Sequence, residues 1–276
     1  MSELLIQPQW LAEHLNDADL RIVDLCKPDR YAEHHVPGAV HLPYDELVVK
    51  NPPVGGLLPG REAFAASMGG LGIDNGHHVV AYDEEGGGRA SRLIWSLHAY
   101  GHTRASLLDG GATAWHQEGY PLTADGDAPE PSAFEATLNE AVIADYDYIL
   151  EHLQQPGVAL LDARSLEEYT GVRRNAEHGG HIPGAKRLEW TELMDRDRNL
   201  RLKPAEEIQA QLVHLGIDAA QEVIVYCQTH HRSALNYVAL RRLGFTRVRG
   251  YHGSWSDWGN RPGAPVATGT VPFASP

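Results

Sequence analysis

The sequence predicts an α/β fold made of two tandem copies of one module, each a mostly parallel β-sheet flanked by helices. Three observations lead to this prediction: a long internal repeat, a polar segment between the copies, and short apolar runs that alternate with longer amphipathic ones. Strands that alternate with helices along a chain are typical of α/β units on a parallel sheet. A chain of 276 residues is also long enough for about two domains of ordinary size.

The internal repeat runs through most of the chain. The run Leu-Gly-Ile-Asp at 71–74 recurs unchanged at 215–218. His-Val-Pro-Gly-Ala at 35–39 is matched by His-Ile-Pro-Gly-Ala at 181–185, and a short insertion within 171–180 lengthens the second copy. Matches in the same order with few gaps indicate a duplicated domain, because solenoids need three or more repeats of shorter period.

The repeat sets the expected domain boundaries. We expect a first module at residues 1–122, a linker at 123–133 and a second module at 134–276. The linker region is polar, acidic and rich in proline, with the run Asp-Ala-Pro-Glu-Pro-Ser at its end. Such a composition favours a connection that lies over the surface.

Apolar periodicity predicts the elements of the second copy. In chain order they are a strand at 159–161 that ends at Asp162, an amphipathic helix at 205–215, a buried strand at 222–226 and a helix at 233–243 closed by Gly244. In parallel sheets ligands bind beyond the carboxyl ends of the strands. Cys227 directly follows the strand at 222–226 and therefore falls at that edge.

Composition and charge exclude several classes of function. The formal net charge of −14 argues against a nucleic acid or an anionic membrane surface as a partner. No segment approaches the ~20 apolar residues that span a bilayer, and the first seven residues lack the features of a signal peptide. We therefore expect a cytoplasmic protein. Two cysteines in such a chain give no disulfide framework.

The chemistry is expected in the turn that follows the strand at 222–226. It reads Cys227, Gln228, Thr229, His230, His231, Arg232 and Ser233, where the helix begins. Backbone N–H groups of a tight turn and the N-terminus of a helix both favour an anion. Together with Arg232 or a protonated histidine, such a setting lowers a cysteine pKa from ~8.5 to between ~3.5 and ~7.5. The turn predicts a reactive Cys227 thiolate that requires no metal and no organic cofactor.

A cysteine at a strand end, four loop residues and an arginine at the sixth place resemble the active-site loop of the rhodanese family. The resemblance covers nearly the whole chain, since Asp162-Ala163-Arg164 and the runs at 180–185 and 250–255 are similar to family signatures. The loop Cys-Gln-Thr-His-His-Arg looks like that of a bacterial branch of the thiosulfate sulfurtransferases. Two tandem modules with a cysteine in the second alone are similar to the thiosulfate and 3-mercaptopyruvate enzymes.

The resemblance implies a double displacement. The Cys227 thiolate takes the outer sulfur of a small anionic donor, thiosulfate, and a thiophilic acceptor such as cyanide or a thiol removes it from the persulfide. Two alternatives stay open. The donor can be 3-mercaptopyruvate, or the protein can be a persulfide carrier or sensor that delivers sulfur to thiol proteins.

The first copy offers an internal comparison. Tyr82 aligns with Tyr226, so Asp83 stands at the position of the cysteine, and Arg89 aligns with Arg232. A carboxylate cannot carry a transferable sulfur. We therefore expect the first module to be catalytically silent and to serve as one wall of the cleft over Cys227.

The loop residues are assigned separate roles. We expect Arg232 to brace the loop backbone, with direct contact to an anion as a secondary role. Gln228 and Thr229 are expected to act through their backbone N–H groups. For His230 and His231, contact with substrate and a solvated position on the loop remain open.

Other residues near the predicted edge are expected to be structural. Asp24 and Asp162 should tie the turns at the ends of their strands through hydrogen bonds. Arg164 is expected to pair with a carboxylate rather than to add positive charge to the cleft. Cys26 aligns with Arg164 in the silent copy and is expected to have no part in the chemistry.

The sequence also departs from the family pattern. Basic side chains follow the cysteine in the animal thiosulfate enzymes, whereas Gln228 and Thr229 are neutral. Glu168 occupies the place where relatives often carry a substrate-binding arginine. Arg173 and Arg174 in the insertion are candidates to replace that charge. The persulfide carrier is therefore better supported than the identity of the donor.

Two other readings of the loop are disfavoured. Phosphatases and arsenate reductases with a cysteine loop need five residues between cysteine and arginine, whereas Arg232 leaves four. A zinc site made of Cys227, His230 and His231 would place adjacent histidines in one tight loop without a second cysteine, which is a poor set of ligands.

Overall fold

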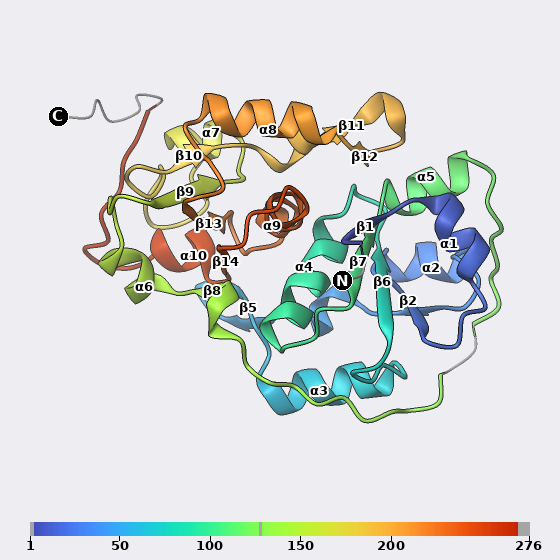
Figure 1. The fold of residues 1–276 in the computed structure, drawn as a ribbon. Helices are drawn as coiled ribbons and strands as arrows, with labels where there is room; N and C mark the ends of the chain where they lie inside the picture. The colour runs from blue at the N-terminus through green and yellow to red at the C-terminus, as the bar shows by residue number, and fades with distance from the viewer. Residues whose placement is uncertain (1–2, 127–128, 270–276) are drawn as a thin grey trace. The chain divides into compact units, whose positions relative to one another are not determined.

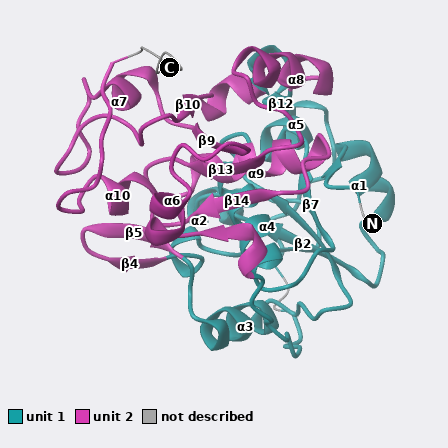
Figure 2. Ribbon diagram, turned by 60° about the vertical axis from the view of Figure 1, so that its left-hand side comes forward, with its two compact units in different colours: residues 1–48, 58–139, 194–202 teal, residues 49–57, 140–193, 203–276 magenta. Residues whose placement is uncertain are grey.

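The computed structural model describes residues 3–126 and 129–269. The chain divides into two compact units, each assembled from several segments. The first consists of residues 1–48, 58–139 and 194–202, and the second of residues 49–57, 140–193 and 203–276 (Figure 2). Each unit has its own sheet and its own core.

The first unit is built on a five-stranded sheet in which every neighbouring pair is parallel, in the order β1-β7-β6-β2-β3. Its strands are β1 (Leu5–Ile6), β2 (Leu20–Asp24), β3 (Ala39–His41), β6 (His78–Tyr82) and β7 (Ala105–Leu108) (Figure 1). Its helices are α1 (Pro8–His14), α2 (Pro28–Glu33), α3 (Arg61–Gly70), α4 (Gly88–Ala99) and α5 (Gly111–Gln117), with a 3-10 turn at Tyr44–Glu46.

The second unit repeats this plan. Its parallel sheet has the order β10-β9-β13-β14-β8. The strands are β8 (Ile143–Ala144), β9 (Val158–Asp162), β10 (Lys186–Arg187), β13 (Glu222–Tyr226) and β14 (Val248–Tyr251). The helices are α6 (Tyr146–Glu151), α7 (Leu166–Thr170), α8 (Ala205–His214), α9 (Arg232–Arg242) and α10 (Ser254–Trp258), with 3-10 turns at Glu140–Val142 and Trp190–Leu193.

The two sheets have the same strand order when matched by repeat position, which confirms the predicted duplication and the α/β class. In the second unit β13 lies between β9 and β14, and α9 packs against β13 and β14. The β-branched residues of β13 fit this central position, since residues 223–226 are fully buried. The observed β9, α8, β13 and α9 agree with the predicted elements to within one residue at each end, and α8 and α9 each end one residue earlier than predicted.

Each unit has a separate apolar core. One cluster of buried residues includes Ile22, Val80, Tyr82 and Trp115, and the other includes Leu160, Ile224, Tyr226, Trp255 and Trp258. Tyr82 and Tyr226 occupy matching places at the ends of β6 and β13. Each unit therefore buries its sheet against an apolar cluster of its own.

Two short hairpins are exchanged between the copies, a feature that the sequence analysis did not foresee. The hairpin β4 (Val49–Asn51) and β5 (Val54–Leu57) lies within the first sequence repeat but belongs to the second compact unit (Figure 2). The hairpin β11 (Met194–Asp195) and β12 (Arg201–Leu202), with a 3-10 turn at Arg196–Arg198, lies within the second repeat but belongs to the first unit. The compact units therefore do not follow the predicted boundaries residue by residue, and those boundaries stay a prediction.

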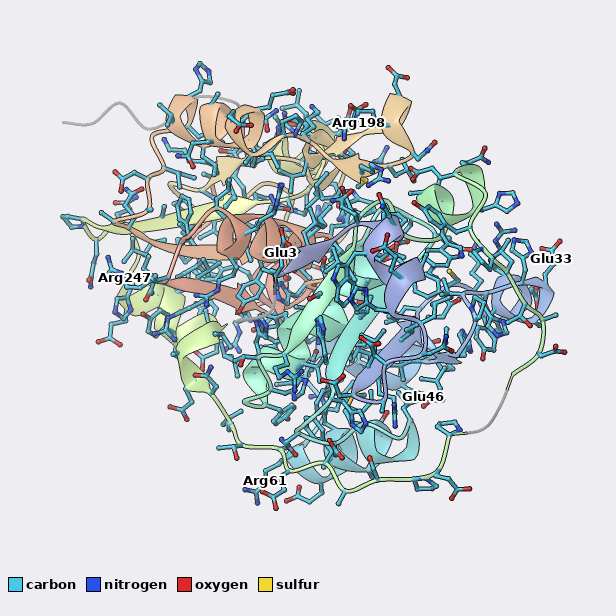
Figure 3. The ribbon with its side chains drawn as sticks, turned by 45° about the vertical axis from the view of Figure 1, so that its right-hand side comes forward. Glu3, Glu33, Glu46, Arg61, Arg198 and Arg247 are labelled. Atoms are coloured by element: carbon cyan, nitrogen blue, oxygen red, sulfur yellow. The ribbon has the colours of Figure 1, made fainter. Side chains whose placement is uncertain are left out.

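Charged side chains of both signs lie on the outside of the molecule. The labelled residues of Figure 3, which are Glu3, Glu33, Glu46, Arg61, Arg198 and Arg247, are all exposed. Of the predicted linker at 123–133, residues 127 and 128 lie outside the described part of the chain, and the described remainder is mostly exposed or half-buried. Within residues 3–126 and 129–269, no helix is long and apolar enough to cross a membrane.

Candidate functional site

The candidate site is the turn between β13 and α9. β13 ends at Tyr226, Cys227 follows at once, and α9 begins at Arg232. Two backbone bonds hold the start of this turn: Trp255 N–H donates to the Cys227 carbonyl at 2.9 Å, and Ser256 N–H donates to the Gln228 carbonyl at 2.9 Å. The first turn of α10 therefore fixes the position of the cysteine.

The Ser254 side chain adds another hydrogen bond that holds Cys227 in place. Its hydroxyl accepts the Cys227 N–H at 3.2 Å and donates to the Tyr251 carbonyl at 2.7 Å. Ser254 adopts a left-handed backbone with φ +51°, which is uncommon for a residue other than glycine. The hydroxyl satisfies two buried backbone groups, so this strained position has a clear structural use.

The Cys227 sulfur lies in a cradle of hydrogen-bond donors. The side chain is fully buried, and burial alone would raise the pKa of the thiol. Four opposing effects outweigh burial: the positive charge of Arg232, the Ser233 hydroxyl, and the backbone N–H groups of Ser233 and Thr229. The pKa of Cys227 is therefore lowered from its usual value, in the direction that the sequence predicts.

Arg232 forms a two-point ion pair that the sequence analysis did not anticipate. Its two terminal nitrogens donate to the Glu168 carboxylate at 2.6 and 2.9 Å. Through this ion pair the guanidinium ties the start of α9 to α7, while the predicted bracing of the loop backbone stays a prediction. The geometry matches the planar fork of arginine, which binds a carboxylate in two places.

Glu168 is only 4% exposed, so its charge depends on its partners. Burial would raise its pKa, but the hydrogen bonds and charge of Arg232, with the Ser165 N–H and Arg164, lower it to about 2. Glu168 also closes a capping box with Ser165 at the start of α7. Position 168 therefore holds a buried carboxylate that pairs with Arg232.

The insertion reaches the site through an amide rather than through its arginines. Asn175 donates from Nδ2 to Glu168 Oε1 at 3.0 Å, and its carbonyl accepts from Gln228 Nε2 at 3.1 Å. Arg173 and Arg174 are exposed, and Arg174 pairs with Glu177 at 3.6 Å. Asn175 therefore links the insertion both to the ion pair and to the loop.

The two loop histidines have different surroundings. His230 is fully buried with φ +54°, and its Nδ1 lies 2.8 Å from the Ser233 hydroxyl. A solvated position is therefore wrong for His230, because its side chain is fully buried and contacts Ser233 at the start of α9. His231 is half-buried, and its ring centre lies 5.9 Å from that of Trp190.

Asp162 and Arg164 form a closed, buried pair beside the loop. The Asp162 carboxylate accepts the Arg164 backbone N–H at 2.9 Å and the guanidinium Nη2 at 2.6 Å. Arg164 also donates to the Gly180 carbonyl at 2.7 Å and lies over the Trp255 ring at 4.4 Å. The expected pairing of Arg164 with a carboxylate and the turn-tying role of Asp162 are confirmed.

The corresponding turn of the first unit is occupied by its own side chain. The Asp83 carboxylate accepts three backbone N–H groups, from Glu85 at 2.9 Å, Gly87 at 2.8 Å and Ala90 at 2.9 Å. Arg89, in contrast, lies within 3.7 Å of Glu84 and 3.6 Å of Glu85. An anion cradle is thus kept in both copies, but in the first copy a fixed carboxylate fills it.

The other cysteine of the chain is Cys26. Cys26 is buried beside Asp24, whose carboxylate accepts the Cys26 N–H. Burial and then the Asp24 charge raise the pKa of Cys26 well above its usual value. In the part of the chain that the structure describes, no group of three or more His, Cys, Asp or Glu side chains is placed to hold a metal ion.

Sequence reasoning missed Asn175, Ser254 and Ser256 as neighbours of the loop. Ser254 lies within the run at 250–255 that resembles a family signature and Ser256 directly follows it, so a signal existed, but their hydroxyls were not singled out. Asn175 lies in an insertion with no counterpart in the first copy. No internal comparison could identify it.

Comparisons with known proteins agree with this geometry. The family model of the Rhodanese-like domain matches residues 7–118 and 145–261. A thiosulfate sulfurtransferase of Azotobacter vinelandii is 43% identical over 263 residues, covering 95% of this chain and 96% of the relative. The sulfur carrier protein TtuD of Thermus thermophilus is 33% identical over 281 residues, covering 97% of each chain.

A solved structure extends the likeness to the fold. SseA of Escherichia coli, described in terms of 3-mercaptopyruvate sulfotransferases, superimposes with a TM-score of 0.81 at 28% identity. The match covers 92% of this chain and 99% of that one. The likeness therefore spans both copies rather than one module.

Proposed function

Because this chain belongs to the rhodanese family, we propose that it is a thiosulfate sulfurtransferase that carries the transferred sulfur on Cys227. The observation that carries the proposal is the cradle: one buried thiol with a lowered pKa, surrounded by donors from Thr229 and Ser233 and stabilised by the charge of Arg232. A thiolate is the form of cysteine that attacks sulfur. The same donors suit the negative sulfur of a persulfide.

The proposed reaction has two balanced steps. In the first, the Cys227 thiolate attacks the outer sulfur of thiosulfate, a sulfur–sulfur bond forms to the enzyme, and sulfite leaves with the electron pair of the broken bond. In the second, cyanide or a thiolate attacks the outer sulfur of the persulfide, and the Cys227 thiolate is the leaving group. No proton, metal or external oxidant is needed, and thiocyanate or a new persulfide is the product.

The size of the cradle supports sulfur rather than phosphate as the group held. Four residues separate Cys227 from Arg232, and the imidazole of His230 lies buried within that turn. A tetrahedral oxyanion bound there would need the arginine charge, but the Arg232 guanidinium is engaged by Glu168 at two points. A single sulfur atom needs only the N–H and O–H donors that surround the thiol.

A second candidate is a carrier that passes its sulfur to thiol proteins. The likeness to TtuD, named a sulfur carrier protein, favours it. The carrier would use the same Cys227 and the same first step, so the two proposals differ in the acceptor. Because the chain is similar to SseA, we take 3-mercaptopyruvate as the alternative donor. A cytoplasmic location and the absence of nucleic acid or membrane partners stay predictions.

Turnover measurements test the proposal. The purified protein is given thiosulfate with cyanide, and thiocyanate formation is followed; parallel assays use 3-mercaptopyruvate as donor and a thiol as acceptor. We expect thiocyanate from thiosulfate, with Cys227→Ala inactive and Cys26→Ala active, because Cys26 lies outside the cradle. Turnover with 3-mercaptopyruvate but not with thiosulfate would show that 3-mercaptopyruvate is the donor. Retention of even a tenth of the activity in Cys227→Ala would refute the role of Cys227.

A further inference from the structure

The exchanged hairpin β4–β5 contacts the Cys227 turn within the second compact unit. The Gly55 N–H donates to the Ser256 hydroxyl at 3.1 Å, and that hydroxyl lies 3.3 Å from the Gly55 carbonyl. The Ser256 N–H in turn holds the Gln228 carbonyl of the loop at 2.9 Å. Two hydrogen bonds through Ser256 therefore link the hairpin to the turn.

The hairpin also lies directly against Thr229. A Cβ atom added at Gly56 would lie 2.8 Å from the Thr229 carbonyl carbon and closer still to its oxygen. One added at Gly55 would lie 3.3 Å from Thr229 Cγ2. Only two adjacent residues without side chains allow so close an approach of two backbones. We refer to Gly55 and Gly56 as the glycine pair.

The residue that the glycine pair contacts, Thr229, is part of the sulfur cradle. The Thr229 N–H is one of the donors that lower the pKa of Cys227. Gly56 contacts the carbonyl of that same residue, so its contact limits where the Thr229 backbone can lie. The neighbouring Gln228 carbonyl is fixed through Ser256 at the other side. The hairpin thus restrains the turn at two successive residues.

We propose that the glycine pair is a positioning element of the Cys227 site, supplied by the repeat that lacks the cysteine. Its backbone contact restrains Thr229 from the carbonyl side, so that the Thr229 N–H, in the peptide whose Gln228 carbonyl Ser256 holds, points at the sulfur. The repeat without the cysteine therefore contributes directly to the chemistry at Cys227. The proposal rests on the function proposed above only for its turnover consequences, because the state of the thiol can be measured without any sulfur donor.

The chain offers matched controls for the strain of an added side chain. Gly56 has φ +74°, a conformation that costs any L-residue free energy wherever it occurs. Gly216 in the second unit and Gly38 in the first have φ +71° and +77°, with nothing within 4 Å of an added Cβ. Gly216→Ala and Gly38→Ala therefore reproduce the backbone strain of Gly56→Ala without the contact to Thr229.

The test is the pH dependence of Cys227 alkylation by iodoacetamide, read by peptide mass in wild type and in the three alanine variants. We expect Gly56→Ala to shift the midpoint upward by about one to two pH units, as the loss of one hydrogen bond to a charged group would. Gly216→Ala and Gly38→Ala should keep the wild-type midpoint. With thiosulfate, Gly56→Ala should load sulfur slowly at neutral pH and recover at high pH.

A second variant covers the case in which Gly56→Ala does not fold. Gly55 has no positive φ, so Gly55→Ala adds only the contact with Thr229 Cγ2. Gly55→Ala should shift the midpoint in the same direction by a smaller amount. Thr229→Ser removes that methyl group but keeps the N–H, so adding it to Gly55→Ala should reverse the shift. Midpoints for Gly55→Ala and Gly56→Ala equal to those of the control glycines would overturn the proposal. A wild-type protein that alkylates as expected but takes no sulfur from thiosulfate would instead overturn the proposed function.

Discussion

At the scale of single residues, the ion pair of Glu168 and Arg232 decides how much positive charge the site can offer. Both terminal nitrogens of Arg232 are taken by one carboxylate, and Asn175 adds a bond to the same carboxylate. The charge of Arg232 still lowers the pKa of Cys227, because the guanidinium stays close to the sulfur. We infer that the thiolate owes its stability to donors of fixed geometry as much as to net charge.

This ion pair predicts a pH-dependent contribution to folding. The pKa of Glu168 is lowered to about 2 in the folded protein, against a usual value of 4.5 for a glutamate side chain. A lowered carboxyl pKa stabilises the fold above the unfolded pKa, and this stabilisation is lost as the pH falls through the folded value. The difference corresponds to about 3 kcal/mol at neutral pH.

Glu168→Gln should therefore reduce the free energy of unfolding at pH 7 and remove part of its decline between about pH 4.5 and pH 2. Denaturant unfolding of both proteins across that range measures the effect, with Glu177→Gln as a control on an exposed carboxylate of the insertion. Parallel pH curves for wild type and Glu168→Gln would contradict the assignment.

At the scale of elements, both copies use the same turn for opposite purposes. In the second unit the turn after β13 surrounds a thiol with donors, and in the first the turn after β6 gives its N–H groups to Asp83. A carboxylate in this position holds the loop without any ligand. In the turn after β6, the Asp83 carboxylate therefore occupies the place that the thiol has in the turn after β13.

Asp83→Ala should destabilise the first unit while leaving the chemistry at Cys227 unchanged. It leaves three N–H groups around Asp83 without their acceptor, which costs about 2–4 kcal/mol in the free energy of unfolding. Formate should restore part of this loss in the variant and have little effect on wild type. Denaturant unfolding with and without formate, together with sulfur loading from thiosulfate, checks both parts. A variant as stable as wild type would show that the carboxylate does not hold the turn.

At the scale of the whole molecule, the exchanged hairpins couple the two repeats. Residues 49–57 belong to the second unit, and residues 194–202 belong to the first. In the first unit Arg201 pairs with Glu118 at 2.7 Å, and the Asp109 carboxylate accepts the Leu202 N–H at 2.8 Å. Each unit is therefore completed by a segment from the other repeat.

This exchange predicts that the two units unfold together. Loss of either unit removes the anchor of a segment that the other needs, so calorimetry should show one transition whose calorimetric and van't Hoff enthalpies agree. Two resolved transitions, or different midpoints by fluorescence and circular dichroism, would show that the units are independent.

Local pattern was enough to predict the fold class and the position of the cysteine. β13 has consecutive β-branched residues, and Cys227 follows it directly, so the strand end and the nucleophile are both visible in the chain. The exchange of the hairpins was not predictable, because Val49–Leu57 has no pattern that shows which sheet it packs against. In the sequence alone the glycine pair looks like part of an ordinary turn, and only its contact with Thr229 in the structure indicates a further role.

The side-chain partners in the site were harder to predict for the same reason. Glu168 is singled out in the sequence by its place in the family pattern, but its pairing with Arg232 depends on distances between α7 and α9. The burial of His230 depends on a left-handed backbone that is uncommon for residues other than glycine, so the sequence left both substrate contact and a solvated position open. Contacts between segments distant in sequence, rather than local propensity, account for each of these differences.

The most direct test of the account is the mass of the intact protein after incubation with thiosulfate and removal of excess donor. The account predicts one added sulfur atom in wild type and in Cys26→Ser, none in Cys227→Ser, and its loss when cyanide is added. Peptide mass spectrometry should place that sulfur on Cys227. An added sulfur that persists in Cys227→Ser, or a wild type that gains none from thiosulfate, would contradict the central claim.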